Sequence, residues 1–258
     1  MSKAFAPSDA GAPVVDPVSA YLDAVRNILS QQDGYVATVV VGSLASEDFD
    51  PARSDLDLIP LYEAPLTREE KVRITSRLRH RALPCPAHGL DLVAYVRAEV
   101  RGPSPAPTLE FSISSGATWK DDISFDEVYP GGLIDLAAAR QFGSTLEGVP
   151  VASLVGPVDP DQVLAEIRRS LNWHLDKIHD PFHDPLGSNA VLNACRGLHF
   201  QRTGALVSKS AGAAGFLDGV HGDLVRRALE TRTSMFADPL PKAEVVAFVG
   251  EAAARCDP

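Results

Sequence analysis

The stretch from Tyr35 to Tyr62 constrains the fold of this chain more than any other. It begins with an apolar run rich in β-branched residues, Tyr35–Val41, which is typical of a buried strand. The run stops at Gly42-Ser43, and a polar loop follows. The chain then becomes apolar again as SDLDLI, residues 54–59. We therefore expect two strands that are joined by a polar loop.

Two carboxylates are expected on one face of the second strand. Asp55 and Asp57 are separated by Leu56, and alternate side chains of a strand point to the same face. Carboxylates that are held side by side repel each other and need a compensating charge. Mg²⁺ is the natural candidate, because this hard cation binds one or two carboxylates together with water and substrate phosphates. A solvated strand edge could carry the same acids, but the apolar residues around them favour a functional pair.

Gly42 and Ser43 fit the same kind of site. Glycine lets the backbone approach a ligand closely, and serine can offer its N–H and its hydroxyl to a phosphate. A short helix that begins near Leu44 would add exposed amides and the positive end of its dipole. The pattern indicates a nucleoside triphosphate that is held by backbone and hydroxyl groups at one end and by metal at the other.

A third carboxylate, Asp91, lies in the strand-like segment GLDLVAYV, residues 89–96. Taken alone, such an acid is more often found at a turn or at the start of a strand. However, VVGSLASEDFDPARSDLDLIPLY resembles the signature of the polymerase-β-type nucleotidyltransferases, in which Gly-Ser and a short spacer precede Asp-x-Asp. That superfamily places a third carboxylate on a later strand, so the resemblance implies this role for Asp91.

Composition and charge limit the classes of function. No stretch approaches the roughly 18 apolar residues that a membrane span needs, and the N-terminus lacks an apolar signal core. A net charge of −10 argues against binding to the nucleic-acid backbone, which needs a basic surface. The same charge would attract a cationic second substrate, although an acidic surface can also serve solubility alone. The three cysteines, Cys85, Cys195 and Cys256, are widely spaced, and we interpret them as reduced thiols of a cytoplasmic protein. We expect the protein to be a monomer.

The pattern along the chain predicts an α+β protein with two domains. We expect a flexible tail over residues 1–16, a domain with a mixed sheet and flanking helices over 17–157, and an all-helical bundle over 158–258. The resemblance above and the narrower one below imply that the first is a nucleotidyltransferase domain and that the bundle closes over ATP and substrate. Helices are predicted over 17–32, 67–83, 134–146, 161–178, 189–203, 218–231 and 242–254, with a further strand over 108–114 and an extended segment over 151–157. Thr67 and Glu70 predict a capping box at the start of one helix.

Separate segments of the second half narrow the resemblance. NAVLNACR, residues 189–196, and TGALVSKSAGAA, residues 203–214, resemble the VLTLxR and TGKIxPK motifs of the streptomycin/spectinomycin adenylyltransferases. IDLA at 134–137 and LVGP at 154–157 are also similar to that family. The resemblance extends from about Gly34 to Phe216.

The resemblance implies Mg²⁺-dependent transfer of AMP from ATP, bound between the two domains, to a hydroxyl of an aminoglycoside or aminocyclitol. Such a reaction is catalysed mostly by positioning and charge neutralisation. The implied roles are as follows: Gly42, Ser43, Ser54, Asp55 and Asp57 bind the triphosphate and two Mg²⁺ ions, Asp91 shares a metal and acts as general base, Arg196 and Lys209 close onto the phosphates, and Asp135 lies near the drug or the interdomain site. Without the resemblance, Arg196 would be interpreted as a surface salt-bridge residue and Lys209 as a lysine at a helix start.

The chain also departs from the family. The family's base is usually glutamate, whereas here it is Asp91, and Ser208 stands where the family has proline. Trp173 either corresponds to a drug-contacting aromatic residue or packs in the helical core. Adenylylation of a partner protein is an alternative that the long helical domain disfavours. A nucleotide-binding regulator without turnover is another alternative, which the intact set of acids disfavours.

Overall fold

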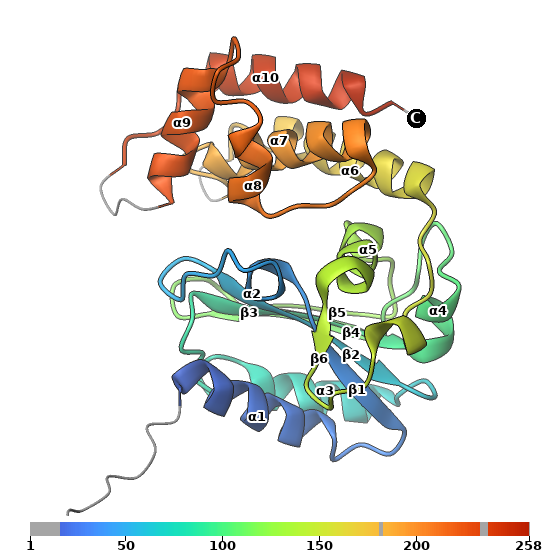
Figure 1. Cartoon of the computed structure of the whole chain (residues 1–258). Helices are drawn as coiled ribbons and strands as arrows, with labels where there is room; N and C mark the ends of the chain where they lie inside the picture. Colours follow the sequence, from blue (N-terminus) through green and yellow to red (C-terminus); the bar gives the residue numbers. More distant parts are fainter. Residues whose placement is uncertain (1–15, 181–182, 233–236, 258) are drawn as a thin grey trace, which may run out of the picture.

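The computed structural model describes residues 16–180, 183–232 and 237–257, and it has two parts that are stacked on each other (Figure 1). The sheet part comes first in the chain, and the helical part follows. The predicted tail lies outside the described residues except for Asp16, whose carboxylate accepts a hydrogen bond from Ser19 N at the start of the first helix. The division at residues 157 and 158 into separate domains stays a prediction.

The sheet part contains a six-stranded sheet with the order β5-β4-β3-β2-β1-β6. Only β2 and β3 are parallel, and the other neighbouring strands are antiparallel, so the predicted mixed sheet is confirmed. The bounds are β1 Tyr35–Val40, β2 Asp55–Tyr62, β3 Gly89–Val96, β4 Phe111–Gly116, β5 Asp122–Phe125 and β6 Ser144–Thr145.

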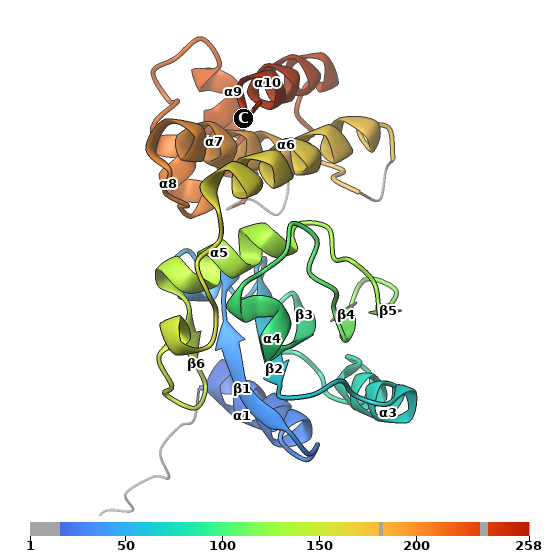
Figure 2. The same ribbon diagram turned by 90° about the vertical axis from the view of Figure 1, so that its right-hand side faces the viewer.

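Helices cover both faces of the sheet (Figures 1 and 2). On one face, α1 and α3 pack against Leu56 and Leu58 of β2 and their neighbours on β3. On the other face, α5 packs through Leu136 and Ala139, and it lies between the sheet and the helical part. The helices of the sheet part are α1 Pro17–Leu29, α2 Gly42–Ala45, α3 Arg68–Leu78, α4 Arg97–Arg101 and α5 Gly132–Phe142.

Local sequence signals explain where several elements begin. The predicted capping box is confirmed, because Thr67 Oγ1 accepts from Glu70 N while the Glu70 carboxylate accepts from Thr67 N. The helix ends at Leu78 rather than at residue 83, since His80 N donates to Ser115 Oγ on β4 and leaves the helical path. The segment that was predicted to be extended contains a short 3-10 helix, Val151–Ser153, closed by the bond from Ser153 N to Pro150 O.

The helical part has its own core, which is separate from the two faces of the sheet. Its helices are α6 Pro160–Asp176, α7 Ser188–Thr203, α8 Lys209–Ala214, α9 Gly222–Thr231 and α10 Lys242–Arg255. Close packing of α7 on α6 depends on Gly197, where a Cβ atom would lie 2.8 Å from Ile167 Cγ2. Gly204 adopts a left-handed conformation with φ 67° and ends α7 after Thr203, the residue at which the predicted helix also ends. No helix within the described ranges is both long and apolar enough to span a bilayer.

Polar contacts join the two parts at several places, and two of these link residues that are far apart in the chain. In the loop before β2, Asp48 accepts hydrogen bonds from Ser210 Oγ at 2.8 Å and from Arg232 Nη1 at 3.0 Å. Behind α5, the side-chain amide of Gln141 donates to Leu206 O at 2.6 Å and accepts from Leu206 N at 2.9 Å. These contacts hold the helical part over the sheet face that carries Asp57 and Asp91.

Candidate active site

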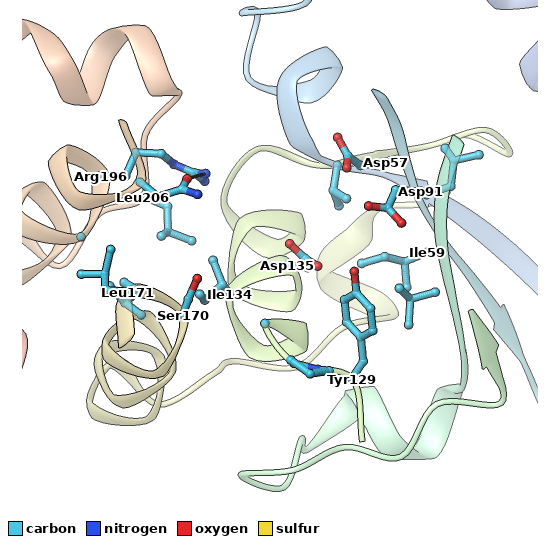
Figure 3. A pocket seen from close by; sticks show the side chains of 18 residues that line it. Asp57, Ile59, Asp91, Tyr129, Ile134, Asp135, Ser170, Leu171, Arg196 and Leu206 are labelled. Atoms are coloured by element: carbon cyan, nitrogen blue, oxygen red, sulfur yellow. Dashed lines mark hydrogen bonds between the residues drawn. The ribbon is translucent and has the colours of Figure 1, made fainter. Parts of the chain in front are cut away.

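The centre of the site is a pair of carboxylates on neighbouring strands. Asp57 of β2 and Asp91 of β3 are direct partners in the parallel register, and both strands are buried around them. Both acids belong to the sheet face that α5 covers, because their neighbours Ile59 and Val93 pack in that layer. Figure 3 shows the two carboxyl groups close to each other, with Asp135 of α5 facing the same space. The expected convergence of Asp57 and Asp91 is therefore present in the structure.

Burial and mutual repulsion make the charged forms of these acids unfavourable. The pKa of Asp57 lies well above its ordinary value, because the carboxyl is buried and faces Asp91 and Asp135. Burial, followed by repulsion from Asp55, raises the pKa of Asp91 to about 6, and a hydrogen bond with Ser114 opposes the shift. A site with such uncompensated negative charge is prepared to receive cations.

Asp135 belongs to the same group of acids. It lies in the first turn of α5, which begins after Gly131 in a left-handed conformation with φ 89°. Burial and Asp91 raise the pKa of Asp135 to about 7, while Arg196 lowers it. The structure places Asp135 at the boundary between the two parts, where it lines the two cavities described below.

Two cations of the helical part face the acids. Arg196 of α7 donates from Nε to Val207 O at 2.9 Å and from Nη1 to Asn193 Oδ1 at 3.4 Å, so it is not the surface salt-bridge residue of the alternative interpretation. Lys209 is the first residue of α8. Burial, followed by the charges of Arg196 and Arg232, lowers the pKa of Lys209 to about 8. The structure also explains Ser208, whose hydroxyl caps α8 by accepting from Ala211 N.

The Gly-Ser turn is in close contact with Asp57. Gly42 has φ 63°, and a Cβ atom at this position would lie 1.8 Å from Asp57 Oδ2. Ser43 Oγ is buried and has no hydrogen-bond partner among the described residues, so this hydroxyl remains available to a ligand. Helix α2 begins at Gly42 rather than near Leu44, and its four residues form a single turn. Ser54 is buried at the end of the same loop, where its hydroxyl accepts from Asp50 N at 3.1 Å.

Two neighbouring cavities, which share lining residues, lie between the sheet part and the helical part. The smaller cavity has a volume of about 240 Å³ and is lined by acids and by Tyr129, whose hydroxyl Figure 3 shows pointing toward Asp91 and Asp135. The larger cavity has a volume of about 570 Å³ and is lined by the Gly-Ser turn and the cations. The residues that line both are Asp57, Asp135 and Arg196.

Asp55, a member of the predicted metal set, contacts a histidine ring. Its Oδ1 atom lies 3.1 Å from His88 Nδ1, and the His88 ring packs against Trp119 with a centroid distance of 4.7 Å. Among the residues that the structure describes, no group of three His, Cys, Asp or Glu side chains is arranged to hold a metal ion. The acids are therefore not a preformed cage. Their hard oxygen donors and uncompensated charge nevertheless fit Mg²⁺, and the metal set stays a prediction.

Trp173 lies at the protein surface and not in the core of the helical part. Its side chain is half exposed, and its ring packs edge-on against His183 with a centroid distance of 4.1 Å. Packing in the helical core is therefore wrong for this residue. Trp173 does not line either cavity, although His183 lines the larger one, so its contact with a substrate stays a prediction. The preceding residues of the loop, 181–182, lie outside the described structure.

The sequence interpretation missed several side chains around these cavities. Tyr129, His88 and Asn193 line them, as does Arg232, which pairs with Asp48 from a position 184 residues away in the chain. No local pattern identifies such pairs, because only the tertiary fold brings them together.

The paired acids on a mixed sheet, the Gly-Ser turn and the helical cover define a nucleotidyltransferase fold with a helical C-terminal part. Residues 153–255 match the family model "Aminoglycoside adenylyltransferase, C-terminal domain". The helical part thus belongs to this domain family, which confirms the resemblance inferred from the sequence.

A solved structure shows the same fold over nearly the whole chain. It is the crystal structure of spectinomycin adenyltransferase AAD(9) from Enterococcus faecialis with ATP and spectinomycin, with a TM-score of 0.75 and 17% sequence identity. The similarity covers 93% of this chain and 99% of that protein. No curated protein matches the chain in sequence.

Proposed function

We propose that this protein transfers AMP from ATP to a hydroxyl group of a cationic aminoglycoside or aminocyclitol antibiotic, with Mg²⁺, and releases pyrophosphate. One observation carries the proposal: the acids Asp57, Asp91 and Asp135 and the cations Arg196 and Lys209 together line the same pair of neighbouring cavities between the two parts. The family match of the helical part and the fold shared with AAD(9) support this reading.

The larger cavity suits the triphosphate. Ser43 supplies an unpaired buried hydroxyl, and Arg196 and Lys209 supply positive charge from the opposite side. A bound triphosphate would stabilise these cations, which repel one another in the cavity. Hydrogen bonds between charged groups are among the strongest in proteins. ATP binding therefore draws the helical part toward the sheet part and couples occupancy to closure.

Asp55, Asp57 and Asp91 would hold Mg²⁺ beside the phosphates. Bound divalent cations neutralise charge on the attacking and leaving oxygens of an in-line displacement. The high pKa of Asp57 follows from burial and neighbouring acids, and this is the charge that a cation offsets. Asp55 can join the set by exchanging its contact with His88, since both groups are partly exposed.

We propose Asp91 as the general base. The acceptor hydroxyl oxygen forms a bond to the α-phosphorus, the bond from that phosphorus to the pyrophosphate oxygen breaks, and the hydroxyl proton passes to Asp91. Burial and Asp55 raise the pKa of Asp91 to about 6, and a base works best when its pKa lies near the working pH. Asp91 lines the smaller cavity, which we assign to the acceptor.

The lining of the smaller cavity favours a cationic acceptor. Asp135 and Asp91 supply negative charge, while Tyr129 and Ser170 offer hydroxyl groups. The AAD(9) structure was determined with spectinomycin, an acceptor of this class. We propose that Trp173 contacts the acceptor at the rim. We also propose that the enzyme is cytoplasmic, because Cys85, Cys195 and Cys256 are free and buried. A monomer is the oligomeric state that we propose.

The test is pyrophosphate release from ATP and Mg²⁺ with streptomycin or spectinomycin. We expect release with at least one of the two drugs and none without acceptor. No release with either drug would contradict the assigned acceptor class. Labelled ATP added to cell lysate then separates the alternative, because a labelled protein band would indicate adenylylation of a partner protein.

A further inference from the structure

A buried histidine on α6 connects the rim of the larger cavity to Arg196. His174 is 2% exposed, and both of its ring nitrogens have partners. Its Nδ1 atom lies 2.9 Å from His183 Nε2, and its Nε2 atom lies 3.1 Å from Asn193 Nδ2. The three side chains come from α6, from the loop before α7 and from α7 itself. They form a continuous polar chain through an otherwise apolar contact between helices.

The donors and acceptors of this chain can be assigned. The amide nitrogen of Asn193 can only donate, so His174 Nε2 must accept and the ring proton must reside on Nδ1. That proton is then donated to His183 Nε2. Burial, with smaller contributions from His183 and Lys209, lowers the pKa of His174 to about 4, so the ring is neutral and keeps this arrangement at neutral pH.

The arrangement fixes which way the Asn193 amide points. Because Nδ2 is bound to His174, Oδ1 faces the opposite direction, toward Arg196 Nη1 at 3.4 Å. The other anchor of the guanidinium is the bond from Nε to Val207 O at 2.9 Å. Two anchors on different edges of a planar group restrict its rotation, which leaves the remaining N–H donors aimed at the cavities that Arg196 lines.

We propose that Asn193 is a positioning residue that orients Arg196 toward the nucleotide phosphates, and that His174 and His183 act through it. The proposal rests on the proposed function, in which Arg196 contacts the triphosphate. Preorganisation of this kind improves affinity because less rotational freedom is lost when the ligand binds. A flipped Asn193 amide would instead present its NH₂ group to the guanidinium and repel it.

The proposal is tested by ATP titration calorimetry with Mg²⁺ and no acceptor. Asn193→Leu removes the acceptor of Arg196, and His174→Phe removes the group that holds the amide in its orientation. We expect each to raise the Kd for ATP about fivefold to tenfold, the loss typical of one hydrogen bond to a charged group at long distance. Asn172→Leu is the matched control, since Asn172 is exposed on α6 and its substitution is expected to leave the Kd unchanged.

A double-mutant cycle separates positioning from general damage to the fold. In an Arg196→Ala background, Asn193→Leu is expected to change the Kd no further, because the group that it orients is gone. Thermal unfolding of each variant is measured alongside. An undiminished effect in that background, or an unchanged Kd in the single variant, would overturn the proposal.

A second readout does not depend on ATP. The Nε–H group of Arg196 is held by Val207 O, and its NMR signal reports how fast this proton exchanges with solvent. We expect exchange at least threefold faster in Asn193→Leu than in wild type or Asn172→Leu, on the order of one lost weak contact. Equal exchange would overturn the inference even if ATP binds. Wild-type protein that binds no ATP would contradict the proposed function, and the exchange rate would still decide the inference.

Discussion

Gly42 leaves the space that the carboxylate of Asp57 fills: a Cβ atom on Gly42 would lie 1.8 Å from Asp57 Oδ2. The backbone at Gly42 has φ 63°, which L-residues with side chains adopt only at a cost. A side chain at position 42 would therefore have to displace Asp57. This contact joins the loop that we assign to the triphosphate to the strand that we assign to the metal.

The first prediction concerns Gly42→Ala. We expect it to lower the free energy of unfolding by about 1–3 kcal/mol and to reduce AMP transfer about a hundredfold or more, because the methyl group must displace Asp57. Urea unfolding and the pyrophosphate assay measure the two effects. Gly204→Ala is the matched control, since φ is 67° there but nothing lies within 4 Å of the added carbon. It is expected to lose stability and to retain activity, and equal activity in both variants would contradict the account.

The second prediction concerns the stability of Asp91→Asn in the absence of Mg²⁺ and ATP. Burial and Asp55 raise the pKa of Asp91 from 3.8 to about 6, so the folded state disfavours the charged form. Well below pH 3.8 both states are neutral at this position, and the penalty accumulates as the pH rises from 3.8 to about 6. Asparagine carries no charge, so the variant is expected to be more stable than wild type by on the order of 3 kcal/mol at about pH 8.

This gain in stability is expected to accompany a loss of AMP transfer, since Asp91 is the proposed base. Urea unfolding between about pH 4 and pH 8 measures how the difference in unfolding free energy depends on pH. A difference that stays constant over this range would show that ionisation of Asp91 does not penalise the folded state.

The third prediction concerns the contact between the two parts. Asp48 accepts from Ser210 N at 3.2 Å as well as from the Ser210 hydroxyl and Arg232. We expect Asp48→Ala to speed amide exchange at Ser210 about tenfold, because the helical part opens more often when this acceptor is gone. Hydrogen exchange followed by mass spectrometry measures it. Asp223→Ala, which removes an exposed partner of Arg226, is the control, and the same acceleration there would refute the role of Asp48.

The fourth prediction tests stability without touching the site. Lys71 is 3% exposed and lies 2.9 Å from the buried Glu110, and it also pairs with Asp126. Lys71→Met leaves Glu110 buried without its cation, and we expect a loss of about 3–5 kcal/mol in unfolding free energy. Chemical denaturation measures this loss. Arg226→Met, on an exposed ion pair, is the comparison, and a loss of similar size there would contradict the assignment.

Local signals predicted the framework of this protein well. The capping box at Thr67, the end of a helix at Thr203 and the shared face of Asp55 and Asp57 all depend on residues within a few positions of one another, where spacing determines geometry. The resemblance implied that Asp91, on a later strand, joins Asp57, and the structure pairs the two residues in parallel register.

The features of the site that the sequence did not predict depend on contacts between residues far apart in the chain. Asp55 contacts the ring of His88, with 3.1 Å between its Oδ1 atom and His88 Nδ1, and no sequence pattern indicates that these side chains meet. The position of Trp173 was undecided because helical spacing does not distinguish a rim position from a core position when the neighbouring helices are unknown. The chain from His183 to Arg196 likewise depends on how α6 and α7 pack.

The most direct test of the central claim uses ATP labelled separately at the α- and γ-phosphates, with Mg²⁺ and either streptomycin or spectinomycin. Because the account places the acceptor hydroxyl beside Asp91 for attack on the α-phosphorus, the α-label is expected to move to the antibiotic and the γ-label to pyrophosphate. Asp57→Asn is expected to abolish both transfers. A γ-label on the antibiotic, or undiminished transfer by Asp57→Asn, would contradict the account.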